Sequence, residues 1–177
     1  MLLRFKNLTI RNAETTDSDQ LSLWWNDGAV MSHAGFPNGL GTTPQDVEEK
    51  IRRDSDSTCR RLMIELEGAS IGEMVYRNMG SGVAEIGIKI CIFSQQNKGY
   101  GKILLSMLIR ALFENMQYQK IILDTSPSNL RARHVYEELG FQNIRVRENA
   151  WRDQTGTFQS IADYELLPSN FVDFARK

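Results

Sequence analysis

A glycine-containing loop followed by a helix limits the fold of this chain more than any other feature. The loop reads Gln95-Gln96-Asn97-Lys98-Gly99-Tyr100-Gly101-Lys102 and follows a strand-like run that ends near Phe93. After it, apolar residues recur every three or four positions, which predicts a central helix with a buried face of Leu104, Met107, Leu108, Ala111, Leu112 and Met116. Glycines let a backbone approach a ligand closely, and free amides at a helix start favour anions. The segment therefore predicts a phosphate or pyrophosphate site between a strand and a helix.

The spacing of this loop excludes two nucleotide-binding motifs. A Walker loop needs four residues between its glycines and then Lys-Ser or Lys-Thr, which the loop lacks. A dinucleotide fingerprint needs a third glycine at the position that Leu104 occupies. Taken alone, the loop is also consistent with a glycine-rich helix entry that binds nothing.

The rest of the chain predicts an α/β fold in one domain, residues 1–177, without repeats or linkers. The patterns indicate about seven strands, at residues 8–11, 62–66, 71–77, 83–93, 120–124, 144–151 and 157–166. They indicate about four helices, at residues 16–25, 44–53, 102–116 and 129–139. Thr43 and Ser128 are the expected N-caps of the second and fourth helices, and Gly140 closes the last one. Residues 26–41 hold four glycines and a proline, so we expect a long loop that contacts substrate.

Charge and residue usage argue against several classes of partner. The chain carries 21 Lys and Arg against 22 Asp and Glu, so nothing favours a nucleic-acid-binding surface. Two cations within Met1–Lys6 argue against a signal peptide or membrane anchor, and we expect a cytoplasmic protein. Only two cysteines, Cys59 and Cys91, and two histidines occur, without metal-ligand spacing, so neither a disulfide framework nor a metal site is expected.

Two segments of the chain carry a family resemblance. Gln96-x-x-Gly99-x-Gly101 resembles the pyrophosphate-binding signature of the GCN5-related N-acetyltransferase (GNAT) superfamily. Asn129-x-x-Ala132-x-x-x-Tyr136-x-x-x-Gly140-Phe141 resembles its second cofactor motif. Residues 8–11, 23–31 and 84–87 further resemble the branch of the ribosomal-protein N-terminal acetyltransferases. The stretch from Asp124 to Ala132, with Trp24 and Trp25, has a local resemblance to aminoglycoside 6'-N-acetyltransferases.

The resemblance implies a fold, a reaction and a cofactor site. The fold is a mixed, mostly antiparallel sheet that splays between the fourth and fifth of the seven expected strands, beside a bulge in the fourth. The reaction is direct attack of an amine on acetyl-CoA in a ternary complex. A backbone amide near Ile92 or Phe93 would polarise the acetyl carbonyl. The implied acetyl-CoA contacts are Ile92, Phe93, Gln96, Asn97, Lys98, Gly99, Tyr100, Gly101, Lys102, Asn129 and Tyr136.

Three residues are candidates for the proton transfers. Tyr136 matches the family tyrosine that protonates the departing thiolate, and a phenol is neutral and can donate at pH 7. Glu85 and Asp124 are candidate bases, because an alkyl ammonium with a pKa of about 10 must lose a proton before it attacks. The alternative role for Tyr136 is that of a packed helix tyrosine, and the alternative for Glu85 is that of an exposed strand carboxylate. The alternative for Asp124 is that of a carboxylate that binds the acceptor. Cys91 is weighed as a nucleophile against a packed thiol, and the packed thiol is favoured.

The acceptor amine is the least constrained part of the prediction. Candidate contacts are Trp24, Trp25, Asp27, His33, Phe36 and Asp124. A protein or peptide N-terminal amine is the first choice, and a small cationic amine such as an aminoglycoside or polyamine is the alternative. A non-catalytic sensor of acyl-CoA is the alternative of another class. The last hairpin would close the sheet, shape the acceptor cleft or form a homodimer contact, and the sequence leaves these roles open.

Overall fold

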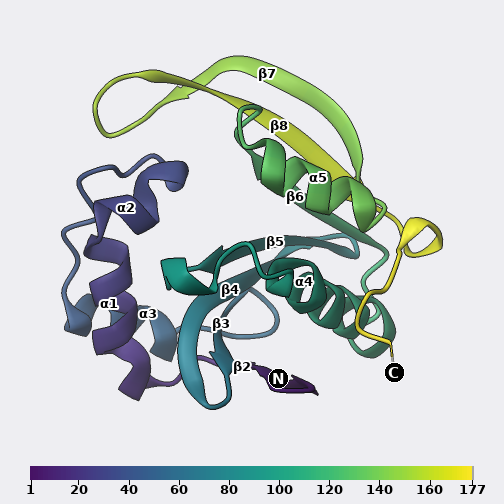
Figure 1. Cartoon of the computed structure of the whole chain (residues 1–177), viewed down its shortest axis with the longest axis horizontal. Coiled ribbons are helices and arrows are strands. Elements are labelled where there is room, and N and C mark those ends of the chain that lie inside the picture. Colours follow the sequence, from purple (N-terminus) through teal and green to yellow (C-terminus); the bar gives the residue numbers. More distant parts are fainter. Residues whose placement is uncertain (177) are drawn as a thin grey trace.

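A computed structural model describes residues 1–176, and its centre is one twisted sheet of eight strands (Figure 1). The strands follow the order β1-β2-β3-β4-β5-β6-β8-β7, and all neighbours are antiparallel except β5 and β6. Their bounds are β1 Leu2–Phe5, β2 Leu8–Asn12, β3 Cys59–Leu66, β4 Ala69–Gly80, β5 Val83–Ile90, β6 Lys120–Thr125, β7 Gln142–Arg152 and β8 Phe158–Leu166.

Five α-helices cover this sheet within residues 1–176, on both of its faces. They are α1 Ser18–Asn26, α2 Gly28–Met31, α3 Pro44–Arg52, α4 Tyr100–Arg110 and α5 Leu130–Glu138. Neighbouring strand residues point to opposite faces. Leu62 and Ile64 accordingly join the core under α4, whereas Met63 joins Trp24, Leu21 and the helices α1 and α3. The N-terminal half of the sheet therefore lies between two helical layers.

The C-terminal half of the sheet is covered by a helix on one face only. Leu123 of β6 and Tyr164 of β8 are buried in the same cluster as Tyr136 of α5. Asp124 and Asp163 are register partners on the opposite face. On that face Asp124 lines a cavity, whereas Asp163 pairs with Arg145 and Arg147 of β7.

The α/β prediction and the fold that the resemblance implied are confirmed, with two additions. β1 was missed because Leu2–Phe5 is a short edge strand of four residues in which only Leu3 and Phe5 pack against the core and Leu2 stays largely exposed. The helix α2 lies inside the expected loop 26–41. Asp27 caps it by accepting from the Ala29 amide, and Gly28 is needed because a Cβ there would meet the Pro37 carbonyl.

Helix caps follow the sequence at one position and differ at another. Thr43 forms the expected capping box with Asp46, and Pro44 is the first residue of α3. The expected cap Ser128 is wrong, since Asn129 Oδ1 accepts from the Ala132 amide at 3.2 Å and α5 starts at Leu130. Gly140, at a φ of 96°, ends that helix as expected.

The sheet splays where β5 and β6 run parallel. Only Val83–Glu85 of β5 pair with β6, and the two strands separate beyond this point. The expected strand 83–93 is too long, since β5 ends at Ile90 and Phe93–Gln95 form a short 3-10 turn. The register of β5 with β4 is regular from Ala84 to Ile90, and the pairing becomes irregular just beyond it, where the amides of Cys91 and Ile92 both donate to the Ile71 carbonyl. The gap therefore lies where β5 and β6 diverge, next to this bulge-like irregularity.

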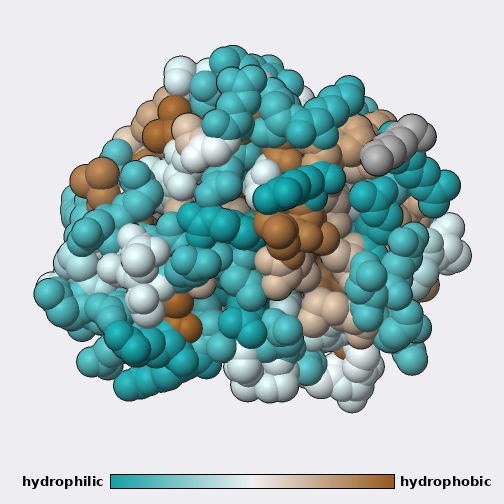
Figure 2. Space-filling model, turned by 90° about the horizontal axis from the view of Figure 1, so that it is seen from below, coloured by the Kyte–Doolittle hydropathy of each residue, from teal (hydrophilic) through white to brown (hydrophobic). Residues whose placement is uncertain are grey.

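The surface carries no broad apolar band on the face shown in Figure 2. Hydrophilic residues dominate there, and hydrophobic residues gather near its middle. No helix within residues 1–176 is both long enough and apolar enough to cross a membrane. In the same range no three His, Cys, Asp or Glu side chains come together as metal ligands would.

Candidate active site

A cavity of about 1140 Å³ opens at the splay between β5 and β6. Its walls come from β4, β5, the end of β6, the starts of α4 and α5, the turn at residues 30–35 and the β7–β8 hairpin. Ligands of open sheets bind at such a site, outside the carboxyl ends of parallel strands. The cavity is therefore the candidate active site.

The glycine loop forms one end of this cavity with an open backbone. A Cβ built on Gly99 or Gly101 would meet no atom within 4 Å, so the backbone of the loop faces free space. Gln96 Nε2 fixes the loop to the end of β5 by donating to the Ile90 carbonyl at 2.8 Å. Arg131 Nη1 donates to Asn97 Oδ1 at 2.8 Å and thereby joins the loop to α5.

Positive charge surrounds this open backbone. The loop leads into the N-terminus of α4, whose first-turn amides are free to bind an anion. Lys102 lies in the same wall, held by Glu138 at 3.0 Å, whereas Lys98 points away and pairs with Gln95. These groups fit the pyrophosphate of coenzyme A, with Lys102 and Arg131 as the cations next to it.

The exposed edge of β5 offers backbone groups next to the loop. The amides of Cys91 and Ile92 both donate to the Ile71 carbonyl. Because hydrogen-bonded and non-bonded pairs alternate in an antiparallel ladder, Ile88 and Ile90 direct their backbone groups away from β4 and toward the splay. Ile92 and Phe93, near which the carbonyl-polarising amide was expected, do not line the cavity, whereas Ile88 and Ile90 do.

Tyr136 lies in the wall of the cavity and is 8% exposed. Its ring packs against Phe141 and Tyr164, with ring centroids 5.9 Å and 5.8 Å away. Burial, strengthened by the nearby Asp124 carboxylate, raises the pKa of Tyr136 to about 12. The phenol therefore stays protonated near neutral pH and can donate its proton. Asn129, its partner in the second motif, also lines the cavity.

Two carboxylates from neighbouring strands face the same space. Asp124 is the last residue but one of β6, and Glu85 is paired in register with Ile122, two residues before Asp124. Glu85 forms a 3.4 Å ion pair with Arg77. Burial in the wall raises the pKa of Asp124 above its usual range, and the charges of Glu85 and Asp163 add to that effect.

Half of the expected acceptor contacts line the cavity. These contacts are Trp25, His33 and Asp124. Trp24 and Trp25 are both packed in the second core cluster, but Trp24 does not line the cavity. Phe36 packs against that cluster, and Asp27 caps α2. Helical spacing predicted the buried face of α1 but could not show which of its two buried tryptophans also reaches the cavity.

Comparison with known proteins identifies the family. The family model described as "Acetyltransferase (GNAT) domain" matches residues 7–142, which is more than half of the chain. The chain belongs to the GNAT family of acetyltransferases. It is thus an acetyl-CoA-dependent N-acetyltransferase, as the two cofactor motifs implied.

Relatives of known activity include aminoglycoside-modifying proteins. The aminoglycoside N(6')-acetyltransferase type 1 of Klebsiella pneumoniae is 43% identical over 150 residues, covering 77% of this chain and 74% of that protein. A kanamycin resistance protein of Rhizobium radiobacter is 43% identical over 61 residues, or 34% of this chain. That match spans little more than half of the Rhizobium protein, 56% of its length.

Solved structures share the fold of this GNAT acetyltransferase. A structure described as a probable acetyltransferase has a TM-score of 0.82 at 20% identity, covering 97% of this chain and 99% of its own. The spermidine N-acetyltransferase of Vibrio cholerae, crystallised with CoA and spermine, has a TM-score of 0.83 at 24% identity. It matches 93% of this chain and 97% of its own. At these identities the likeness concerns the fold.

Sequence reasoning missed a buried carboxylate of this acetyltransferase. Glu73 of β4 is 7% exposed, lines the cavity, and accepts from Trp25 Nε1 and Lys89 Nζ, both at 2.9 Å. Its three-residue network connects α1, β4 and β5. The only signal in the sequence is a charged residue within an otherwise apolar strand run, which an exposed strand position would also produce.

Replacing Glu73 by Ala should lower the free energy of unfolding by about 2 kcal/mol, because the Trp25 N–H and the Lys89 ammonium would lose their partner. For a chain of this size that corresponds to roughly 4–8 °C in Tm. Thermal unfolding measures it, with Glu49→Ala as the control, since Glu49 is an exposed partner in an i,i+4 pair. Equal melting of the two variants would refute a stabilising role for the network.

Cys91 is a packed thiol. It is 3% exposed, and burial, with a contribution from Glu73, raises its pKa to about 12. Since the thiolate is the nucleophilic form, this environment argues against covalent catalysis and supports direct attack of the amine.

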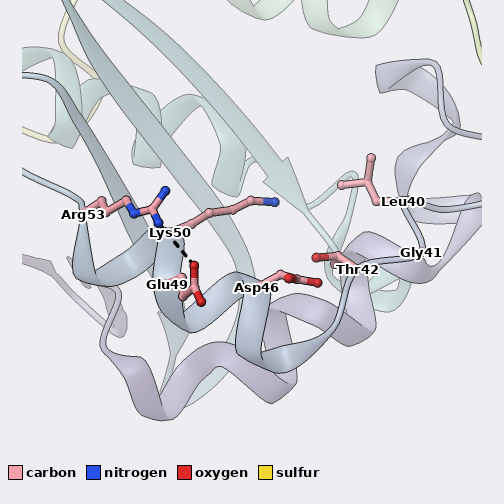
Figure 3. A pocket seen from close by; sticks show the side chains of 7 residues that line it. All are labelled: Leu40, Gly41, Thr42, Asp46, Glu49, Lys50 and Arg53. Atoms are coloured by element: carbon pink, nitrogen blue, oxygen red, sulfur yellow. Dashed lines mark hydrogen bonds and ion pairs between the residues drawn. The ribbon is translucent and has the colours of Figure 1, made fainter.

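A second, shallow pocket of about 380 Å³ lies over α3 (Figure 3). Its polar groups are occupied: Asp46 belongs to the capping box and Glu49 pairs with Arg53. None of the predicted site residues lines it. It is a shallow surface hollow that adjoins the larger cavity, with which it shares Leu40 and Lys50.

Proposed function

We propose that this enzyme transfers the acetyl group of acetyl-CoA to a primary amine of a small cationic acceptor of the aminoglycoside type. The Klebsiella relative, which is named for acetylating the N(6') position of aminoglycosides, supports this acceptor class. The relatives thus favour the alternative expectation over a protein N-terminal amine. A ribosomal-protein acceptor remains a prediction without such support.

A carboxylate without a protein partner carries the proposal. Asp124 makes no side-chain hydrogen bond or ion pair with any residue of the described chain. The other carboxylates in the wall are engaged: Glu73 with Lys89, Glu85 with Arg77, and Glu138 with Lys102. Asp124 is therefore the carboxylate left to meet an ammonium group, next to Tyr136.

The proton transfers follow from the same two residues. The acceptor ammonium gives one proton to Asp124, whose raised pKa makes it a better base than an ordinary aspartate. The free amine forms the C–N bond as the thioester C–S bond breaks, and the sulfur takes the Tyr136 proton. The phenolate then regains the second nitrogen proton through water. The products are the N-acetylated amine, coenzyme A as its thiol, and one proton released later from Asp124.

Backbone groups assist at the carbonyl. The free N–H groups of β5 at Ile88 or Ile90 would receive the acetyl oxygen as negative charge builds on it. Such a donor contributes about 3–4 kcal/mol when it is aligned in advance. The position of these amides between the glycine loop and Tyr136 supports that assignment.

An acceptor panel tests the proposal. Kanamycin, spermidine and peptides with a free N-terminus are compared by thiol release from acetyl-CoA and by the mass shift of the product. We expect kcat/KM to be highest for kanamycin. Thiol release with peptides alone would overturn the acceptor assignment. Thermal stabilisation by acetyl-CoA without amine-dependent thiol release would instead favour a sensor.

The Asp124→Asn variant tests whether Asp124 binds the acceptor amine. Loss of a charge-assisted contact, worth about 1.5–3 kcal/mol, should raise the kanamycin KM by roughly 10- to 100-fold and leave the acetyl-CoA KM within about twofold. Asp19→Asn is the matched control, an exposed aspartate of α1 outside the cavity. An unchanged kanamycin KM in Asp124→Asn would remove Asp124 from acceptor binding.

A further inference from the structure

The tip of the β7–β8 hairpin is fastened to the loop that follows α2. The Gln154 backbone N–H donates to the Gly35 carbonyl, and its side-chain Nε2 donates to the Gly39 carbonyl, both at 2.9 Å. Its Oε1 accepts from the Asn38 amide at 2.9 Å. Figure 1 shows the hairpin reaching across to the side of the molecule that holds α2. One glutamine thus joins segments more than 110 residues apart in sequence.

The hydrogen bonds of Gln154 lie next to residues that line the cavity. The Trp151 indole lies on Gly35, where a Cβ would come within 1.9 Å of its Cη2 atom. Trp151 and Gly35 both line the cavity, whereas Gln154 does not. The Gln154 hydrogen bonds therefore hold the two sides of one wall together from outside.

The turn that presents Gln154 is itself fixed. Asp153 Oδ1 accepts from the Thr155 amide at 2.9 Å and the Thr157 amide at 3.0 Å. Asp153 Oδ2 accepts from Gln159 Nε2 at 2.8 Å, and Gln159 lines the cavity. A preorganised turn lets Gln154 bind the loop with little loss of conformational freedom.

We propose that Gln154 is a specificity-determining residue, which confines the acceptor end of the cavity to small amines by keeping the Gly35–Trp151 wall closed. The inference deepens the proposed function and rests on it for the reaction. Gln154 and its hydrogen-bond partners Gly35, Asn38 and Gly39 make no contact with the glycine loop among their hydrogen bonds, so we expect binding of acetyl-CoA not to depend on this wall.

The effect of a Gln154 substitution depends on how exposed its hydrogen-bond partners are. Asn38 and the turn around Gln154 are exposed, so water can replace the hydrogen bond of the Asn38 amide, whereas Gly39 is buried and its carbonyl loses its partner. The backbone hydrogen bond from Gln154 to Gly35 is kept, so the fold should remain. The wall would nevertheless lose the two hydrogen bonds that the Gln154 side chain makes. A small acceptor would then be held less well, and a bulkier amine would be admitted.

Kinetics of Gln154→Ala and Gln154→Glu test the inference. The Glu variant keeps the size and the acceptor for Asn38, but it sets a carboxylate against the Gly39 carbonyl. In both variants we expect the KM for the best small amine, kanamycin or spermidine, to rise about 5- to 30-fold, equivalent to about 1–2 kcal/mol. We expect kcat/KM for a bulkier amine, a peptide chosen to exceed kanamycin in size and bearing one free amine, to rise relative to kcat/KM for the small amine. The acetyl-CoA KM should stay within about twofold.

Gln142→Ala provides the control, because Gln142 is an exposed glutamine at the start of β7, in the same hairpin, and does not line the cavity. An unchanged small-amine KM in both Gln154 variants, or an equal rise of the acetyl-CoA KM, would overturn the proposal. Since the readout is the ratio between a small and a bulky amine, failure of kanamycin as an acceptor leaves this test intact.

Discussion

Tyr136→Phe should lower kcat by roughly 100-fold or more, while the Kd for acetyl-CoA stays within about twofold. The thiolate would have to leave without a positioned proton donor, whereas phenylalanine keeps the ring with which we expect Tyr136 to contact acetyl-CoA. Thiol release at saturating acetyl-CoA and amine measures kcat, and calorimetry measures the Kd.

The Tyr136→Phe substitution removes the hydroxyl and leaves the other contacts of the side chain in place. The Tyr136 hydroxyl forms no hydrogen bond with any other residue of the described chain, and its ring contacts with Phe141 and Tyr164 remain in a phenylalanine. Tyr118→Phe is the control, since Tyr118 is also 8% exposed and does not line the cavity. Equal kcat in both variants would exclude Tyr136 as the acid.

The ionisation of Tyr136 and Asp124 determines in which direction the reaction rate changes with pH. Tyr136 donates in its protonated form, which is lost only as the pH rises through its pKa of about 12. Asp124 accepts in its ionised form, which is lost as the pH falls through its raised pKa. The wild-type rate should therefore fall on the acidic side and show no loss from Tyr136 up to about pH 10.

Replacing both Gly99 and Gly101 by Val should abolish thermal stabilisation by acetyl-CoA. For the wild type, a concentration of 100 times Kd adds about 2.7 kcal/mol to the free energy of unfolding, or roughly 5–10 °C in Tm. The added side chains would fill the free space next to the loop, where the pyrophosphate is expected. The double variant should melt at the same temperature with and without acetyl-CoA.

Backbone strain needs its own control, because Gly99 has a φ of 80° that valine adopts at a cost. Gly68→Val suits this purpose: Gly68 has a φ of 82°, faces open space, and lies in the β3–β4 turn. It should melt lower than the wild type yet keep the full acetyl-CoA shift. A full shift in the Gly99/Gly101 variant would place the pyrophosphate elsewhere.

Local patterns were sufficient to predict most of the fold. The heptad-like apolar spacing from Leu104 to Leu112 indicated α4, and Thr43 with Pro44 indicated the start of α3. The two cofactor motifs could be read because each lies within one short segment. The parts of the site that were missed depend on contacts between distant segments, as Glu73 with Trp25 and Gln154 with Gly39 show. No periodicity in a single sequence records such contacts.

The splay of the sheet also bears on how the protein unfolds. Only three register pairs, Val83 to Glu85 with Lys120 to Ile122, join the first five strands to the last three. This seam is the weakest line of backbone pairing in the molecule, and the cavity runs along it. A cofactor bound there adds contacts to both sides of the seam. Occupancy of the site should therefore couple the opening motions of the two halves into one cooperative unit.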